Sequence, residues 1–135
     1  MADMYIGSVP DLSECLVAGT VVVTVRGEID LEVSRALTER LDALTAGPCP
    51  DVVLDLREMA FIDCAGLSVL CRARNRAVAR AGRLRLVTDS PGFRRILRAV
   101  RLADVFETYG TLSGGLAADG RGADGQAAVP VTVAG

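Results

Sequence analysis

Histidine and lysine are absent from this sequence of 135 residues, so all fifteen of its basic residues are arginines. Without histidine, the chain cannot form a Ser-His or Cys-His nucleophile pair or a histidine-ligated metal site. No apolar stretch approaches the roughly 20 residues that a membrane span requires. Residues 1–12 also lack the positive start and the apolar core of a signal peptide. We therefore expect a cytoplasmic protein without a membrane span.

The four cysteines, Cys15, Cys49, Cys64 and Cys71, include no C-x-x-C pair, so no zinc site or thioredoxin-like motif is expected. If Cys64 and Cys71 share a helix, a rise of about 10 Å separates them, which exceeds the roughly 7 Å between Cα atoms that a disulfide can bridge. We expect reduced thiols, although a bond between Cys15 and Cys49 and an intermolecular bond stay open. No metal is therefore expected. No cofactor is expected either: weak nucleotide binding is conceivable, but a glycine-rich phosphate loop is missing.

Half of the residues are hydrophobic, which is enough for the core of a single domain. Residues 12–118 carry the patterns of strands and helices. Residues 1–11 are expected to form an N-terminal extension, and residues 119–135 a flexible C-terminal tail rich in glycine and alanine.

Strand and helix patterns alternate through the expected domain. Two strand-like runs on either side of Gly19 predict an initial β-hairpin. The expected strands are residues 12–18, 20–25, 52–56, 83–87 and 105–109, and the expected helices are residues 31–46, 64–80, 91–100 and 112–118. Gly27–Asp30 is expected to form a loop, and Gly82 to end the second helix. This order predicts an α/β fold with a mixed central β-sheet, on which the helices pack.

Two aspartates stand before predicted helices. Val52–Leu56 is a short apolar run that is typical of a central strand, and Asp63 follows Phe61 and Ile62 where a helix N-cap is expected. Asp30 stands before the first helix. Because sites in such sheets lie at the carboxyl ends of strands, we expect Asp30 and Asp63 to lie close together. They could serve as a pair of carboxylates for acid–base chemistry, but helix capping is the preferred interpretation.

The segment Phe61-Ile62-Asp63-Cys64-Ala65-Gly66-Leu67 resembles the core signature of STAS domains, and most of all that of the single-domain bacterial anti-sigma factor antagonists. Gly27-Glu28-Ile29-Asp30 resembles the earlier loop motif of that family. The resemblance implies a non-enzymatic domain that binds an anti-sigma factor of the serine kinase type and so releases a sigma factor for transcription. The partner-binding residues that it implies are Gly27, Glu28, Ile29, Asp30, Asp63, Cys64, Ala65, Gly66, Leu67 and Ser68.

Cys64 occupies the position at which the family typically carries a serine that the partner phosphorylates to end binding. A thiol cannot accept this phosphate, so the resemblance implies a protein held in the partner-binding state. Taken alone, Cys64 fits an inert small side chain, a redox-sensitive thiol at a helix N-terminus or a nucleophile. The nucleophile fits worst, because a phosphatase loop needs an arginine where Leu70 stands. Ser68 lies inside the predicted helix and is not expected to replace the missing serine.

Two other functions stay open from the sequence. One is a STAS-type subunit of a larger assembly for lipid transport or stress signalling. The other is a thiol redox sensor that acts through Cys64.

Charge is distributed unevenly along the chain. Residues 72–101 contain ten arginines and one acidic residue, while the rest contains five arginines and sixteen acidic residues. Three of these arginines are expected to form a solvated face of the second helix, namely Arg72, Arg76 and Arg80. Its apolar face is expected to consist of Leu67, Leu70, Cys71 and Val78. The alternation in Arg83–Val87 predicts a strand with one covered face. Nucleic-acid binding is not expected, because interleaved aromatic residues are missing. An acidic partner or a homodimer fits the asymmetry better.

Overall fold

The computed structural model describes residues 12–117, and the expected N-terminal extension and C-terminal tail lie outside this range. The chain divides into two compact units, with the boundary between Leu84 and Arg85. None of the described helices has the length and apolar character that a membrane crossing demands.

The first unit begins with the predicted hairpin, in which β1 (Leu12–Val17) pairs antiparallel with β2 (Thr20–Val25). The turn residues Ala18 and Gly19 both have positive φ angles, of 51° and 88°, as two-residue hairpin turns often require. On its other side, β2 pairs in parallel with β4 (Asp51–Asp55), which gives the order β1-β2-β4. The apolar side chains of β4 are buried, as a strand with two covered faces requires.

The prediction of a loop at Gly27–Asp30 is wrong, because its first three residues form a strand. This strand, β3 (Gly27–Ile29), pairs in parallel with β5 (Met59–Ile62) in a separate two-stranded sheet. The backbone N–H of Gly27 also donates to the carbonyl of Glu58 at 2.9 Å. Strands of three and four residues are too short to show alternation in the sequence, and only their pairing defines them.

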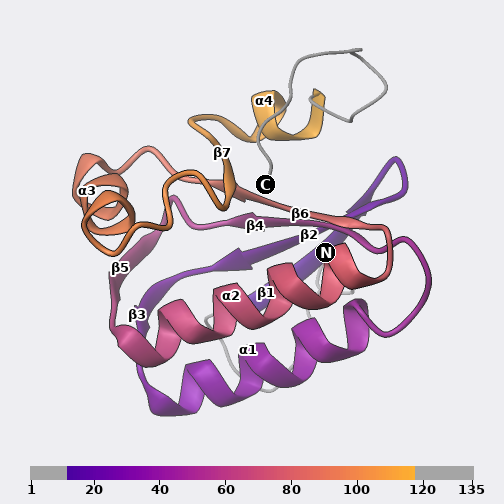
Figure 1. The fold of residues 1–135 in the computed structure, drawn as a ribbon, viewed down its shortest axis with the longest axis horizontal. Coiled ribbons are helices and arrows are strands. Elements are labelled where there is room, and N and C mark those ends of the chain that lie inside the picture. Colours follow the sequence, from indigo (N-terminus) through magenta and orange to yellow (C-terminus); the bar gives the residue numbers. More distant parts are fainter. Residues whose placement is uncertain (1–11, 118–135) are drawn as a thin grey trace. The chain divides into compact units, whose positions relative to one another are not determined.

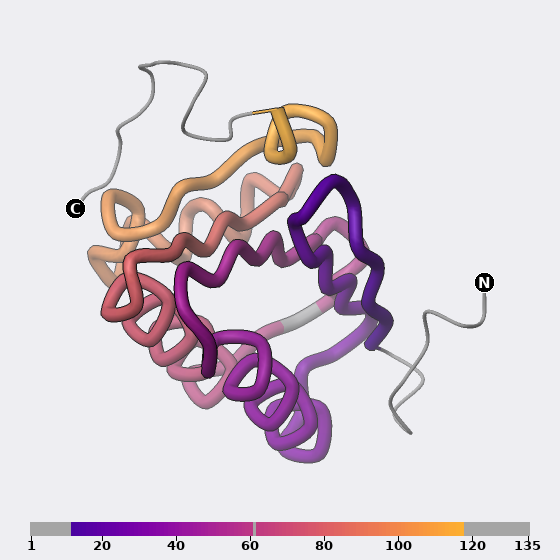
Figure 2. The backbone as a smooth tube through the Cα atoms, turned by 90° about the vertical axis from the view of Figure 1, so that its right-hand side faces the viewer, coloured from indigo at the N-terminus to yellow at the C-terminus, as the bar shows by residue number. Residues whose placement is uncertain are grey.

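Two helices, α1 (Leu31–Leu44) and α2 (Cys64–Ala79), run side by side across one face of the strands of the first unit (Figure 1, Figure 2). Their inward residues include Val33, Leu37 and Leu41 from α1, and Val69, Leu70, Ala73 and Ala77 from α2. The prediction for Val78 is wrong, since this side chain is 49% exposed. The inner face of α2 carries the small residues Ala73 and Ala77 instead of Val78.

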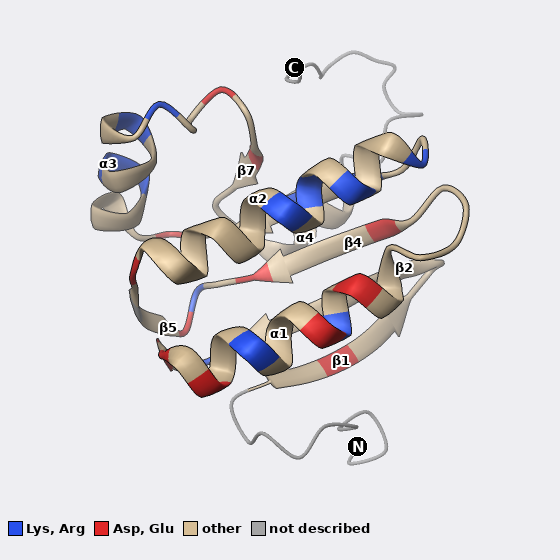
Figure 3. Ribbon diagram, turned by 60° about the horizontal axis from the view of Figure 1, so that its bottom comes forward, with Lys and Arg blue, Asp and Glu red and all other residues tan. Residues whose placement is uncertain are grey.

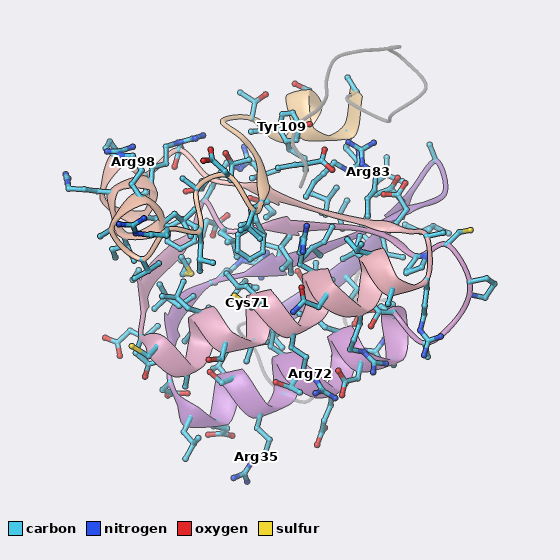
Figure 4. All side chains as sticks on the ribbon, viewed as in Figure 1. Arg35, Cys71, Arg72, Arg83, Arg98 and Tyr109 are labelled. Atoms are coloured by element: carbon cyan, nitrogen blue, oxygen red, sulfur yellow. The ribbon has the colours of Figure 1, made fainter. Side chains whose placement is uncertain are left out.

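The predicted solvated arginine face of α2 is wrong in part, because two of its arginines bond to α1. Arg72 donates from Nε and Nη2 to the two carboxylate oxygens of Asp42, each at 2.9 Å (Figure 4). Arg76 donates to the hydroxyl of Thr45 and to the backbone carbonyl of Asp42, each at 2.9 Å. Arg80 is exposed as expected. The basic face of α2 therefore joins the two helices as well as facing solvent.

Two carboxylates of the first unit have lowered pKa values. Hydrogen bonds from Arg57, at 2.9 and 2.8 Å, lower the pKa of buried Asp55 against the opposing effect of burial. The side chain of Arg72 likewise lowers the pKa of Asp42. Because each folded pKa lies below the unfolded value of about 4, both groups stabilise the fold above that pH. This contribution is lost as the pH falls through the lowered folded pKa.

We expect Asp55→Asn to reduce the free energy of unfolding by about 1–3 kcal/mol at neutral pH, because it removes charge-assisted hydrogen bonds. The deficit relative to the parent should shrink as the pH falls from about 4 through the lowered folded pKa of Asp55, where the folded parent also becomes protonated. Urea unfolding of both proteins over a pH series measures it. Asp104→Asn changes an exposed carboxylate that has no ion pair among the described residues, and should stay close to the parent at each pH. A pH-independent deficit in Asp55→Asn would contradict the assignment.

In the second unit, β6 (Arg83–Val87), which enters from the first, pairs in parallel with β7 (Glu107–Tyr109). Between them lies α3 (Pro91–Ala99), and α4 (Leu112–Ala117) follows β7. Residues 105 and 106, predicted as strand, instead form a turn before β7. With an antiparallel hairpin and parallel pairs elsewhere, the predicted α/β class with a mixed sheet is confirmed.

The predicted alternation of β6 is wrong at Arg85, which is fully buried. Its Nη1 donates to the carbonyl of Gly115, in α4, at 2.7 Å. A buried guanidinium requires such acceptors, and this one lies 30 residues further along the chain. The basic–apolar pattern therefore does not mark an outer face here.

Candidate functional site

Asp30 and Asp63 are the N-caps of α1 and α2, as predicted. The Oδ1 atom of Asp30 accepts a hydrogen bond from the backbone N–H of Val33 at 3.0 Å. Asp63 accepts in the same way from the N–H of Gly66 at 2.9 Å. Each carboxylate accepts a hydrogen bond from one of the unpaired N–H groups at a helix start. Its negative charge also interacts favourably with the positive end of the helix dipole. With these bonds, both side chains have a structural role.

The pairing of β3 with β5 brings the two helix starts together. Ile29 and Ile62 are partners in this parallel pair, and Asp30 and Asp63 are the next residues of the two chains. Both isoleucines are buried in the core and so hold the strand pair in place. The prediction that the two motifs meet in space is therefore confirmed, although the pairing that joins them was not foreseen.

The ten residues implied by the resemblance divide by exposure. Six are exposed, namely Glu28, Asp30, Asp63, Cys64, Ala65 and Ser68. Gly27 and Leu67 are half-buried, while Ile29 and Gly66 are buried. The exposed six are available to a partner, and the buried two support the backbone beneath them.

Gly66 allows the start of α2 to lie close to both short strands. A Cβ atom at this position would lie 2.5 Å from Cγ1 of Ile62 and 3.3 Å from Cγ2 of Ile29. Contacts as short as the first essentially never occur between real side chains, so a larger residue would separate the helix from the strands. The absence of a side chain therefore sets the position of the helix start that carries Cys64.

Cys64 is exposed at the first position of α2, and the four cysteines in the described range are all free thiols. Burial raises the pKa of Cys71, which lies further along the same helix, and this disfavours its thiolate.

Within residues 12–117, no group of three or more cysteine, aspartate and glutamate side chains is arranged to hold a metal ion. Ser68 is exposed on the second turn of α2.

Sequence reasoning missed Leu31, the first residue of α1, whose side chain is 69% exposed. It directly follows Asp30 and lies among acidic residues at the helix start, where Figure 3 shows them. A signal was present, because Leu31 does not fall on the stripe formed by Val33, Leu37 and Leu41. An apolar residue away from the buried stripe of a helix is a candidate contact.

Comparisons with known proteins agree with this fold. A family model described as the STAS domain matches residues 16–114. An anti-sigma factor antagonist from Mycobacterium paratuberculosis is 30% identical, with a TM-score of 0.71 over 83% of this chain and 97% of that chain. The cell fate determinant SpoIIAA of Bacillus, in its phosphorylated form, is 19% identical, with a TM-score of 0.64 over 78% of this chain and 96% of that one.

A sulfate transporter family protein from Wolinella succinogenes shares the fold at 19% identity, with a TM-score of 0.66 over 76% of this chain and 86% of that one. No curated protein sequence matches the chain. The family match covers well over half of the sequence and includes both motifs. The chain therefore belongs to the STAS domain family, and its solved structural neighbours include anti-sigma factor antagonists.

Proposed function

We propose that this protein is an anti-sigma factor antagonist, a non-enzymatic cytoplasmic domain that binds an anti-sigma factor and thereby frees a sigma factor. The proposed partner is an anti-sigma factor of the serine kinase type. The proposed footprint comprises Gly27–Ile29 of β3, Asp30 and Leu31 at the start of α1, and Asp63–Ser68 at the start of α2.

One observation carries the proposal: the β3–β5 pair joins two motifs more than 30 residues apart into one exposed edge. Its exposed members include both charged groups and the apolar Leu31. Protein interfaces commonly combine such an apolar centre with a polar rim. The likeness to the antagonist from Mycobacterium paratuberculosis, at 30% identity over nearly all of that chain, also supports it.

The regulation of this domain is proposed to differ from a phosphoserine switch. A phosphate would add about −1.5 to −2 charge beside Asp63, and like-charge repulsion would weaken a docked partner. Cys64 cannot accept this phosphate from a serine kinase. We therefore expect a protein that stays competent to bind its anti-sigma factor in the presence of ATP.

The test compares the affinity of the parent, Cys64→Ser and Cys64→Asp for candidate anti-sigma factors. We expect Cys64→Ser to bind like the parent, because the two side chains are similar in size. Cys64→Asp should bind at least about tenfold more weakly, since it places a second negative charge beside Asp63. Titration calorimetry measures the three dissociation constants. Equal binding by Cys64→Asp would show that the start of α2 is not the contact.

The same three proteins test the switch. After incubation with the kinase and ATP, Cys64→Ser should carry phosphate at position 64 and lose affinity, while the parent should retain its affinity. Phosphopeptide mass spectrometry identifies the modified residue. Phosphate at Ser68 in the parent, accompanied by loss of binding, would refute the proposal that regulation is absent.

A thiol redox sensor is the second candidate, favoured by the exposure of Cys64 at the N-terminus of α2. Titration with a thiol reagent tests this function, and a reaction rate of Cys64 no faster than that of a free thiol would remove its support.

A third candidate function is that of a subunit in a transport assembly. A pull-down tests it, because recovery of transporter subunits instead of a kinase would favour the assembly.

A further inference from the structure

The first unit carries a predominantly acidic exposed surface, and its nearest exposed basic residue on α1 is Arg35, one turn beyond Leu31. This acidic surface consists of Glu28, Asp30, Leu31, Glu32 and Asp63. The pairing of β3 with β5 brings Asp63 beside Asp30, and Leu31 and Glu32 follow Asp30 at the start of α1. Residues 27–34 and 59–71 contain no basic residue. Leu31 protrudes among the carboxylates as an apolar side chain that is 69% exposed.

The second unit carries an exposed surface of the opposite sign on and after α3. This basic surface consists of Arg95, Ile96, Arg98, Val100 and Arg101, and residues 90–103 contain no acidic residue. Its three arginines form no ion pair with any residue between 12 and 117.

The apolar members of the basic surface are not part of the core. Phe93 and Leu97 form the buried stripe of α3, at 4% and 2% exposure. Ile96 and Val100 are neighbours at a spacing of four on the flank of that stripe, and they are 40% and 47% exposed. Arg94 is excluded from the surface, because its guanidinium donates inside the unit to Thr88 and Thr108.

The two surfaces are complementary in charge, and each has aliphatic side chains among its charges. We propose that the basic surface binds the acidic surface of a second copy of this chain. Leu31 of one copy then packs between Ile96 and Val100 of the other, and the arginines face Glu28 and Glu32. Nucleic acid fits this surface less well, because it exposes aliphatic side chains and no aromatic ring for base stacking.

This self-association covers residues of the proposed anti-sigma footprint. If the proposed function holds, a second copy of the chain therefore competes with the anti-sigma factor for the acidic surface of the first. High concentrations of the protein then limit its own binding to the anti-sigma factor. Exposed ion pairs are individually weak and are screened by salt. The association should accordingly be reversible and strongest at low ionic strength.

Sedimentation equilibrium of the full chain over a concentration series, at about 0.1 M and about 1 M salt, measures the association. We expect the average mass to rise with concentration at low salt and to approach that of the monomer at high salt. The double variants R95E/R98E and E28R/E32R should each associate at least about tenfold more weakly than the parent. An equimolar mixture of the two variants should associate again, because every reversed charge then meets its opposite.

R80E is the matched control, since it reverses an exposed arginine outside both surfaces and should associate like the parent. Thermal unfolding verifies that each variant folds. A monomeric parent at low salt would overturn the proposal, as would unchanged association in R95E/R98E or failure of the mixture to associate. Failure of the proposed function is seen separately, as absent binding to anti-sigma factors in dilute solution where the protein is monomeric.

Discussion

Gly82→Ala is expected to lower the free energy of unfolding by about 3 kcal/mol or more, because the site has no room for a methyl group. A Cβ atom at Gly82 would lie 2.1 Å from the carbonyl oxygen of Pro50 and 2.5 Å from its ring nitrogen and Cδ. These are backbone and ring atoms, so no side-chain rotation can relieve the overlap. The chain itself would have to move.

Movement at this point would break several hydrogen bonds. The N–H of Arg83 donates to the carbonyl of Pro50 at 2.7 Å, and the N–H of Cys49 donates to the carbonyl of Arg80 at 2.9 Å. Together they hold the end of α2 against the turn that precedes β4. Displacement of Gly82 therefore loosens the entry into both β4 and β6.

Urea unfolding of the parent and Gly82→Ala measures the effect. Gly47→Ala is the matched control, because Gly47 lies in the same turn before β4 and a Cβ there would meet no atom within 4 Å. It should leave the stability unchanged or raise it slightly, through the lower entropy of the unfolded chain. Unfolding of Gly82→Ala at the same urea concentration as the parent would show that the approach to Pro50 is not tight.

Gly82 also shows where sequence reasoning stops. The sequence predicted it as the residue that ends α2, a role that relies on a positive φ angle. In the structure, Ala81 has that angle, at 62°, and Gly82 is required for its contact with Pro50. The end of the helix was predictable from a local pattern. The reason for the glycine was not, since Pro50 lies far earlier in the chain.

The same division between local and distant causes explains the other outcomes. The hairpin and the two N-cap aspartates depend on neighbouring residues, so their patterns were visible in the sequence. Three other features each depend on a partner about 30 residues away in the chain: the β3–β5 pair, the hydrogen bonds that join Arg72 and Arg76 to the end of α1, and the burial of Arg85. The candidate site combines both kinds, because local capping sets each helix start and distant pairing brings the two together.

Gly66→Ala is expected to lower the free energy of unfolding by about 2 kcal/mol, although alanine favours a helix over glycine by about 1 kcal/mol. The added Cβ would overlap Cγ1 of Ile62 at 2.5 Å and press on its Cδ1 at 3.1 Å and on Cγ2 of Ile29 at 3.3 Å. Both isoleucines are buried in the short sheet and have little freedom to turn away. The start of α2 should therefore move outward, together with Asp63 and Cys64.

A double-mutant cycle with Ile62→Ala separates this overlap from a general loss of stability. Ile62→Ala alone leaves a cavity and destabilises the fold. The double variant should lose less stability than the two single losses added together, because the methyl group added at position 66 then has room. Gly92→Ala is the matched control in the first turn of α3, where a Cβ would meet only Ser90 Oγ at 3.7 Å. Additive losses in the cycle would mean that Gly66 does not hold α2 against β5. If the proposed function holds, the double variant should also regain affinity for the proposed anti-sigma partner relative to Gly66→Ala, because the position of Cys64 depends on the same contact.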